Sequence, residues 1–168
     1  PRSSCLYIND WNDTVKDMVS AREYVARKYP NLPIYLLGFS LGSFIVRTTH
    51  DLTPYKKEIL IGTGAQSAFL MRIMRTWIGK KYTGRMSCAS DKIHDLMFGT
   101  YGKRFKGRPA NYWLLTDNEK RMEYAGDSLV RQDVSPAFFC EFSKGMECAS
   151  RNLKNPNNTI PTLFLYGK

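Results

Sequence analysis

The alternation of hydrophobic and polar positions in the first 65 residues predicts helices and strands in turn. Apolar positions from Asn12 to Tyr29 recur at helical spacing and predict an amphipathic helix. After a turn at Asn31-Leu32-Pro33, the apolar run Ile34 to Gly38 is typical of a short strand covered on both faces. Ser43 to His50 predicts a second helix, and Glu58 to Gly64 predicts a second strand ending in glycines. Because the two strands are joined through a helix, we expect a parallel sheet with a right-handed crossover.

The junction between the first strand and the second helix reads Gly38-Phe39-Ser40-Leu41-Gly42, which has the form G-x-S-x-G. In such a turn the serine is held in a strained backbone conformation that exposes its hydroxyl at the carboxyl edge of the sheet. Ser40 is therefore the candidate nucleophile, and the Leu41 backbone N–H is the candidate oxyanion donor. We expect Gly38 and Gly42 where a side chain would strike the neighbouring strand or helix. The alternative is a plain strand-to-helix loop with an ordinary serine.

A long insertion, residues 66–150, separates the second strand from a final one predicted at Thr162 to Tyr166. Its length and its amphipathic stripes predict a helical cap over the carboxyl edge of the sheet. In its first helix we expect Phe69, Ile73 and Trp77 to face inward. A second helix is predicted at Asp91–Phe98, where the glycines and basic residues that follow end it. A third is predicted to start at Thr116-Asp117-Asn118-Glu119, and a last one runs from Pro136 towards Asn152.

Both ends of the chain resemble the α/β-hydrolase superfamily. The resemblance rests on Asp10-Trp11-Asn12, on the segment around Ser40, and on the closing run Ile160 to Lys168. Within the superfamily the chain is most similar to the bacterial lysophospholipase and monoacylglycerol-lipase branch, often labelled serine-aminopeptidase-like hydrolases. The resemblance implies an α/β fold: a partial α/β-hydrolase parallel-sheet core from residues 1–65 and 151–168, with a helical cap insertion, or lid, at 66–150. It implies no cofactor and no metal.

Members of that family take the triad acid from just after a late strand and the histidine from after the last strand. Here the late strand is Thr162 to Tyr166 and the sequence stops at Lys168, so we expect the triad acid and histidine to lie outside this chain. His50 is predicted about 15 Å from Ser40 along the same helix, and His94 is predicted on a solvated helix face. The chain looks like a central fragment, and we expect it to be inactive alone.

The resemblance implies that the full-length parent is a serine hydrolase of carboxylic esters that acts through an acyl-enzyme on Ser40. A lysophospholipid, a monoacylglycerol or a similar lipid ester is the expected substrate. Two alternatives stay open, because a fold does not fix a substrate. One is a peptidase, thioesterase or other activity on the same scaffold, and the other is a non-catalytic protein that binds lipid or a partner.

Charge and cysteine content add expectations about partners and location. The net charge is +10, and residues 66–108 carry ten lysines and arginines against two acids. Such a surface could attract anionic lipid to a peripheral contact, although a solvated basic face is the more common explanation of such a charge. No nucleic-acid-binding motif accompanies the charge, so no nucleic acid is expected, and no apolar stretch reaches the 18 residues of a membrane span. The four cysteines show no metal-ligand spacing, which favours reduced thiols in a cytoplasmic protein.

Overall fold

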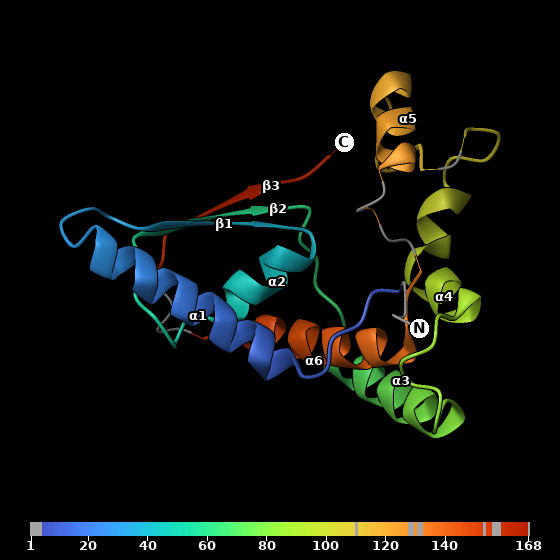
Figure 1. Ribbon diagram of the computed structural model, residues 1–168, viewed down its shortest axis with the longest axis horizontal. Coiled ribbons are helices and arrows are strands. Elements are labelled where there is room, and N and C mark those ends of the chain that lie inside the picture. The colour runs from blue at the N-terminus through green and yellow to red at the C-terminus, as the bar shows by residue number, and fades with distance from the viewer. Residues whose placement is uncertain are drawn as a thin grey trace. The chain divides into compact units, whose positions relative to one another are not determined.

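The computed structural model describes residues 5–109, 111–127, 130, 133–152, 154–155 and 159–167. They form two compact units, one of residues 8–77 and 140–168 and the other of residues 1–7 and 78–139. The elements, shown in Figure 1, follow the order α1 (Trp11–Lys28), β1 (Tyr35–Phe39), α2 (Leu41–Thr48), β2 (Lys57–Ile61), α3 (Ala68–Lys81), α4 (Asp91–Lys103), α5 (Asn118–Gly126), α6 (Pro136–Asn152) and β3 (Thr162–Leu165).

The first unit is built on a parallel sheet in the order β1-β2-β3. Leu37 lies opposite Ile59, which lies opposite Leu163, and this register runs along the whole sheet. The parallel strand–helix–strand arrangement predicted from the sequence is confirmed. All three strands therefore end at one carboxyl edge, where Ser40 follows β1.

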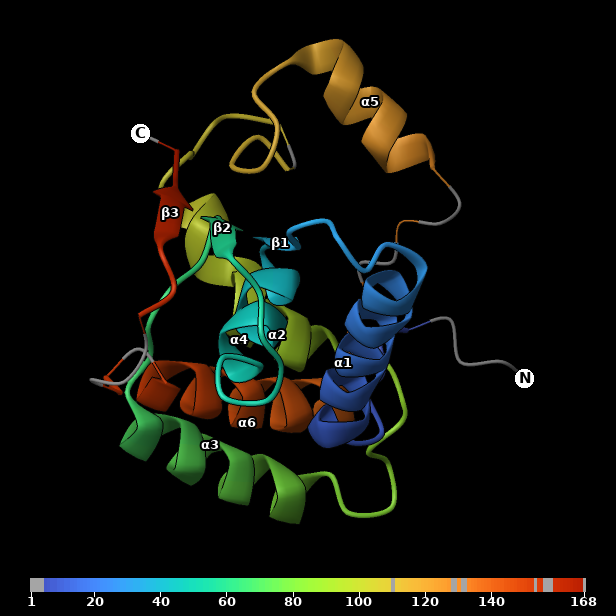
Figure 2. The ribbon, with the colours of Figure 1, turned by 90° about the vertical axis from the view of Figure 1, so that its left-hand side faces the viewer.

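Helix α2 packs on one face of this sheet (Figures 1 and 2). Val46 of α2 forms a buried cluster with Tyr55 and Leu60, flanked by half-buried apolar side chains from β1 and from the residues that precede β1 and β3. On the opposite face, Leu37 is 62% exposed and Leu163 is 52% exposed. The expectation that the first strand is covered on both faces is wrong for the described residues, because the helices of this unit lie on the α2 side.

A second apolar layer joins α1, α2 and α6 through Trp11, Val15, Phe44 and Ala149. Within it, the Trp11 ring of α1 lies close to Gly145 of α6. A Cβ at Gly145 would lie 2.3 Å from two atoms of the Trp11 ring. The Trp11 backbone N–H also donates to Glu141 Oε2 at 3.0 Å, so α6 fixes the first residue of α1.

Helix α3 contacts α6 through its basic face. Arg72 and Arg75 both form ion pairs with Glu147, which is only 7% exposed. The predicted inward stripe is therefore wrong: Phe69 is 74% exposed, Ile73 51% and Trp77 55%. Met71, beside Arg72 on the α6 side, is buried instead, because the ion pairs turn that side of α3 towards α6.

The second unit is helical in its described part. Helix α4 does not end at Phe98 as predicted but continues through two glycines to Lys103. A helical glycine costs only about 1 kcal/mol relative to alanine, and Tyr101, in the extension, stacks on Trp113 with ring centroids 4.9 Å apart. The predicted start of α5 is confirmed, since the Asp117 side chain accepts from the Lys120 N–H at 2.9 Å. Helix α6 begins at Pro136 and ends at Asn152, as predicted.

Candidate active site

Ser40 occupies the sharp turn between β1 and α2, with φ 47° and ψ −115°. It is one of two non-glycine residues with positive φ among those described, the other being Asn111. Such a backbone conformation costs about 1–3 kcal/mol and persists only where surrounding structure imposes it. The strained turn predicted from the G-x-S-x-G pattern is thus present at Ser40.

Three hydrogen bonds impose the turn. The Ser40 N–H donates to the Ile61 carbonyl at the end of β2 at 2.9 Å, which ties the serine to the neighbouring strand. The Ser40 carbonyl accepts from the Ser43 N–H at 2.9 Å and from the Ser43 hydroxyl at 2.6 Å. Ser43 is fully buried, so it is a fixed anchor. The backbone of Ser40 is held on both sides, while the residue itself is exposed and its side chain makes no capping hydrogen bond.

The two motif glycines have different roles. A Cβ at Gly38 would lie 2.6 Å from the Ser43 Cα and 2.7 Å from the Gly42 carbonyl oxygen, so only glycine fits where β1 passes the start of α2. A Cβ at Gly42 would meet nothing within 4 Å. The expectation of a steric need at Gly42 is therefore wrong for the described residues, because its Cβ direction points into open space.

Leu41 is the first residue of α2. Its N–H is one of the amides at a helix start that have no acceptor inside the helix. The helix dipole adds partial positive charge at the same end. These properties suit an oxyanion donor beside the Ser40 hydroxyl, and the role itself stays a prediction.

His50 belongs to a buried cluster that the sequence did not reveal. Its Nε2 lies 2.7 Å from Glu58 Oε2, and neither side chain is more than 1% exposed. Glu58 also accepts from the Tyr55 hydroxyl at 3.0 Å and from the Thr162 hydroxyl at 2.8 Å. Burial alone raises the pKa of the Glu58 carboxyl, but these hydrogen bonds and the charge of His50 outweigh burial and hold the pKa below its ordinary value.

The place of this cluster separates it from Ser40. Glu58 pairs in register with Leu36 and Thr162 near the start of the strands, whereas Ser40 follows the Phe39–Ile61 pair at their end. A glutamate directly before the apolar run Ile59 to Ile61 was the one signal that could have revealed it, because a buried carboxylate requires partners. His50 is thus committed to Glu58. His94 lies on α4, 3.5 Å from the Asp95 carboxylate, with its side chain 38% exposed.

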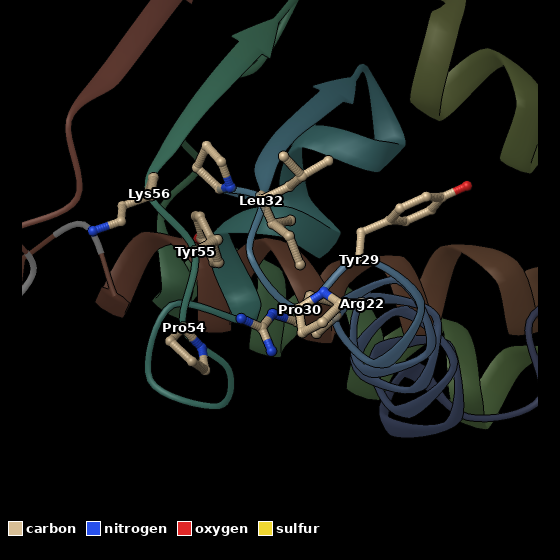
Figure 3. A pocket seen from close by; sticks show the side chains of 10 residues that line it. Arg22, Tyr29, Pro30, Leu32, Pro54, Tyr55 and Lys56 are labelled. Atoms are coloured by element: carbon tan, nitrogen blue, oxygen red, sulfur yellow. The ribbon is translucent and has the colours of Figure 1, made fainter.

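A pocket of about 270 Å³ opens at the start of the strands rather than at Ser40. Arg22 of α1 contributes to its wall, together with Tyr55 and Lys56 from the segment before β2, as Figure 3 shows. Ile34, which precedes β1, lines it as well, so it lies at the end of the sheet remote from Ser40. This pocket is not part of the candidate active site.

Two further features bear on cofactors and membranes. Within the described ranges, no group of three or more His, Cys, Asp or Glu side chains could hold a metal ion. In the same part of the chain, no helix is both long and apolar enough to cross a membrane.

Comparison with known proteins identifies the family. Residues 3–168 match the family described as serine aminopeptidase, S33. The chain belongs to this S33 family of α/β-hydrolases. No protein with curated annotation matches the sequence significantly.

Solved structures share the fold of this S33-family chain. One is titled "Lipase (Open form)", with a TM-score of 0.74 and 16% identity, covering 90% of this chain and 52% of that one. Another is a highly thermostable carboxyl esterase from Bacillus coagulans in complex with glycerol, with a TM-score of 0.68 and 18% identity, covering 95% of this chain and 64% of that one. This chain thus spans between half and two thirds of the length of these structures, and its three parallel strands form part of an α/β-hydrolase core.

Proposed function

We propose that the protein containing this chain is a serine hydrolase of carboxylic esters, with Ser40 as its nucleophile. The observation that carries the proposal is the backbone of Ser40, at φ 47° between β1 and α2 in a chain of the S33 family. A strain of this size at an exposed serine is expected where the hydroxyl must be presented to a substrate.

In the proposed reaction the Ser40 Oγ attacks the ester carbonyl while a histidine takes its proton. The Leu41 N–H donates to the oxyanion, and the alcohol leaves to give an acyl-enzyme that water hydrolyses. His50 is bonded to Glu58, and His94 lies beside Asp95 on α4, so neither is assigned to Ser40 and we propose that the triad histidine and acid lie outside residues 1–168. The chain alone should then have an ordinary serine hydroxyl and at most trace activity.

For the substrate we propose a lipid ester, such as a lysophospholipid or a monoacylglycerol. The basic residues of the 66–108 segment, at a net charge of +8, support an anionic or interfacial substrate. We propose that residues 66–150, which include α3, α4 and α5, act as the cap that shapes the acyl site.

A second candidate is peptide hydrolysis at the same serine. It is favoured by the family description, serine aminopeptidase, and both reactions use the same nucleophile and oxyanion donors. The two candidates differ only in the leaving group, so paired substrates separate them.

The test uses the full-length natural protein and a fluorophosphonate probe, which reacts only with activated serines. We expect labelling and hydrolysis of p-nitrophenyl butyrate by wild type, and loss of both in Ser40→Ala. Removing the nucleophile of a triad typically costs on the order of a millionfold in kcat. Turnover of monoacylglycerol against an amino-acid p-nitroanilide then distinguishes esterase from aminopeptidase.

Ser20→Ala provides the matched control, because Ser20 is an exposed serine on α1. It should keep wild-type labelling and turnover. Equal labelling of wild type and Ser40→Ala would refute the proposal. A full-length protein that binds monoacylglycerol without labelling or turnover would instead support the non-catalytic alternative.

A further inference from the structure

Arg47 is a fully buried cation on the helix that carries the candidate nucleophile. It lies about two turns after Ser40 in α2, and its exposed fraction is 0%. Its Nη1 donates to the Thr63 hydroxyl at 2.9 Å and to the Gly64 carbonyl at 2.7 Å. The Phe44 ring covers the guanidinium, with 5.3 Å between its carbon and the ring centroid. One side chain of α2 thus binds the segment that follows β2 at two points.

That segment occupies the centre of the carboxyl edge. Ile61, the last residue of β2, accepts from the Ser40 N–H at 2.9 Å, and Gly62, the first residue after the strand, donates to the Leu165 carbonyl at 2.9 Å. Residues 62–64, here called the post-β2 segment, therefore follow directly on the residue that holds the Ser40 turn, and they are bonded to the end of β3. A displacement of this segment would move both neighbours.

The post-β2 segment has little rigidity of its own. Gly62 has φ +61°, and a Cβ at Gly62 or Gly64 would meet nothing within 4 Å. Two glycines leave the backbone many accessible conformations. The two bonds from Arg47 act on the residues that follow Gly62, where the sheet no longer holds the chain.

Stability alone gives a poor account of an arginine at this position. Burial lowers the pKa of the Arg47 guanidinium, while the charge of Glu58 opposes this effect, and the side chain remains charged at neutral pH. Desolvating an ion costs several kcal/mol, and a well-packed hydrophobic side chain often replaces a buried ion without loss. The gain must therefore lie in what the guanidinium holds. One nitrogen, Nη1, donates to both the Thr63 hydroxyl and the Gly64 carbonyl, while Nε and Nη2 are buried without a hydrogen-bond partner among the described residues.

We propose that Arg47 is a positioning residue, which clamps the post-β2 segment and so fixes the Ser40 turn relative to the end of β3. This inference rests on the proposed function, because it assigns Arg47 to the geometry of that reaction. It adds to that function a residue that couples α2, the helix after the nucleophile, to the carboxyl end of β2. Loss of the clamp should lower the rate of attack by Ser40 more than the affinity for substrate, since a misplacement of 1 Å can cost about a hundredfold in rate.

Thr63 offers the cleanest test, because it lies in a loop and only its hydroxyl enters the clamp. Thr63→Val removes the acceptor and keeps the shape, whereas Thr63→Ser keeps the acceptor. Arg47→Lys keeps the charge and replaces the planar guanidinium, whose Nη1 makes both bonds, by an ammonium group. In hydrogen–deuterium exchange on the chain, the amides of Ser40 and Gly62, which donate to Ile61 and Leu165, should exchange at least about 10-fold faster in Thr63→Val and Arg47→Lys. Thr63→Ser should match wild type, and α1 should be unchanged in Thr63→Val and Thr63→Ser.

The full-length protein supplies the second readout. We expect Thr63→Val to lower kcat and the rate of fluorophosphonate labelling about 10-fold with KM within about twofold, and Thr63→Ser to restore both. Unchanged exchange and kcat in Thr63→Val and Arg47→Lys would overturn the clamp, as would faster exchange throughout α1 and the sheet. The proposed function fails separately, if Ser40→Ala keeps its activity while the exchange of the post-β2 segment still depends on the Thr63 hydroxyl.

Discussion

Substitution of Gly145 by alanine tests the close packing of α1 on α6. The new Cβ would lie 2.3 Å from Cε2 and Cζ2 of Trp11 and 2.5 Å from Cη2, where ordinary contact begins near 3.4 Å. Relief of the overlap requires a shift of roughly 1 Å, which follows from these two distances. Trp11 is 1% exposed and packs with Val15 and Phe44, so its ring has no free space to enter. The clash must therefore strain the core.

The expected loss follows from two opposing effects. Overpacking a core costs about 1–3 kcal/mol, and an overlap with three ring atoms calls for the upper end of that range. Replacing a helical glycine by alanine stabilises the helix by about 1 kcal/mol. We expect Gly145→Ala to lower the free energy of unfolding by about 2 kcal/mol, which corresponds to a fall in Tm of about 4–8 °C for a domain of this size.

Urea unfolding followed by circular dichroism at 222 nm measures this change. Gly79→Ala is the matched control, since Gly79 lies inside α3 and a Cβ there meets nothing within 4 Å. The control should gain up to about 1 kcal/mol from helix propensity. Adding Trp11→Phe to Gly145→Ala should recover at least about 1 kcal/mol relative to additivity, because the clashing ring atoms are removed. A Gly145→Ala protein as stable as Gly79→Ala would refute the packing argument.

Three further predictions concern the Ser40 turn and the buried carboxylate. Ser40→Gly should raise the free energy of unfolding by about 1–2 kcal/mol, because glycine tolerates φ 47°, and it should abolish fluorophosphonate labelling, because the hydroxyl is removed. A lower Tm than wild type in thermal melts would contradict the backbone strain at Ser40. Gly38→Ala should cost at least about 2 kcal/mol in urea titrations, whereas Gly42→Ala should be neutral or stabilising, and equal effects would speak against the steric difference. Since the pKa of Glu58 is lower in the folded state than its ordinary value, its contribution to stability is complete above that value and is lost as pH falls through the folded-state pKa. Unfolding free energies from pH 7 to pH 3 should thus fall more steeply in wild type than in Glu58→Gln, and parallel curves would exclude a role for this carboxylate.

The Ser40 turn and the parallel sheet could be predicted from the amino-acid sequence. The turn is a local structure: Gly38, Ser40 and Ser43 lie within six positions, so the close approach and the positive φ are decided by near neighbours. The strands are equally visible, because short apolar runs between turn signals are typical of parallel strands. The start of α5 after its N-cap Asp117 and that of α6 at Pro136 follow from local start signals for the same reason.

Tertiary structure alone decided which faces meet. The stripe of Phe69, Ile73 and Trp77 is apolar by sequence, yet the ion pairs with Glu147, more than seventy positions away, turn the other side of α3 towards α6. Gly145 is required only because Trp11 arrives from the far end of the chain. Periodicity reports that a helix has an apolar side, but which side is buried depends on partners brought together by long-range contacts.

The buried charges show the same limit. The partners of Glu58 include Thr162, and Arg47 reaches Gly64, so neither the position of the carboxylate nor the clamp on the post-β2 segment can be seen before the strands are assembled. Buried polar groups need partners, and a sequence names the group but not the partner. The nucleophile could therefore be located from its neighbours, whereas the residues that hold its surroundings in place emerged only from the folded chain.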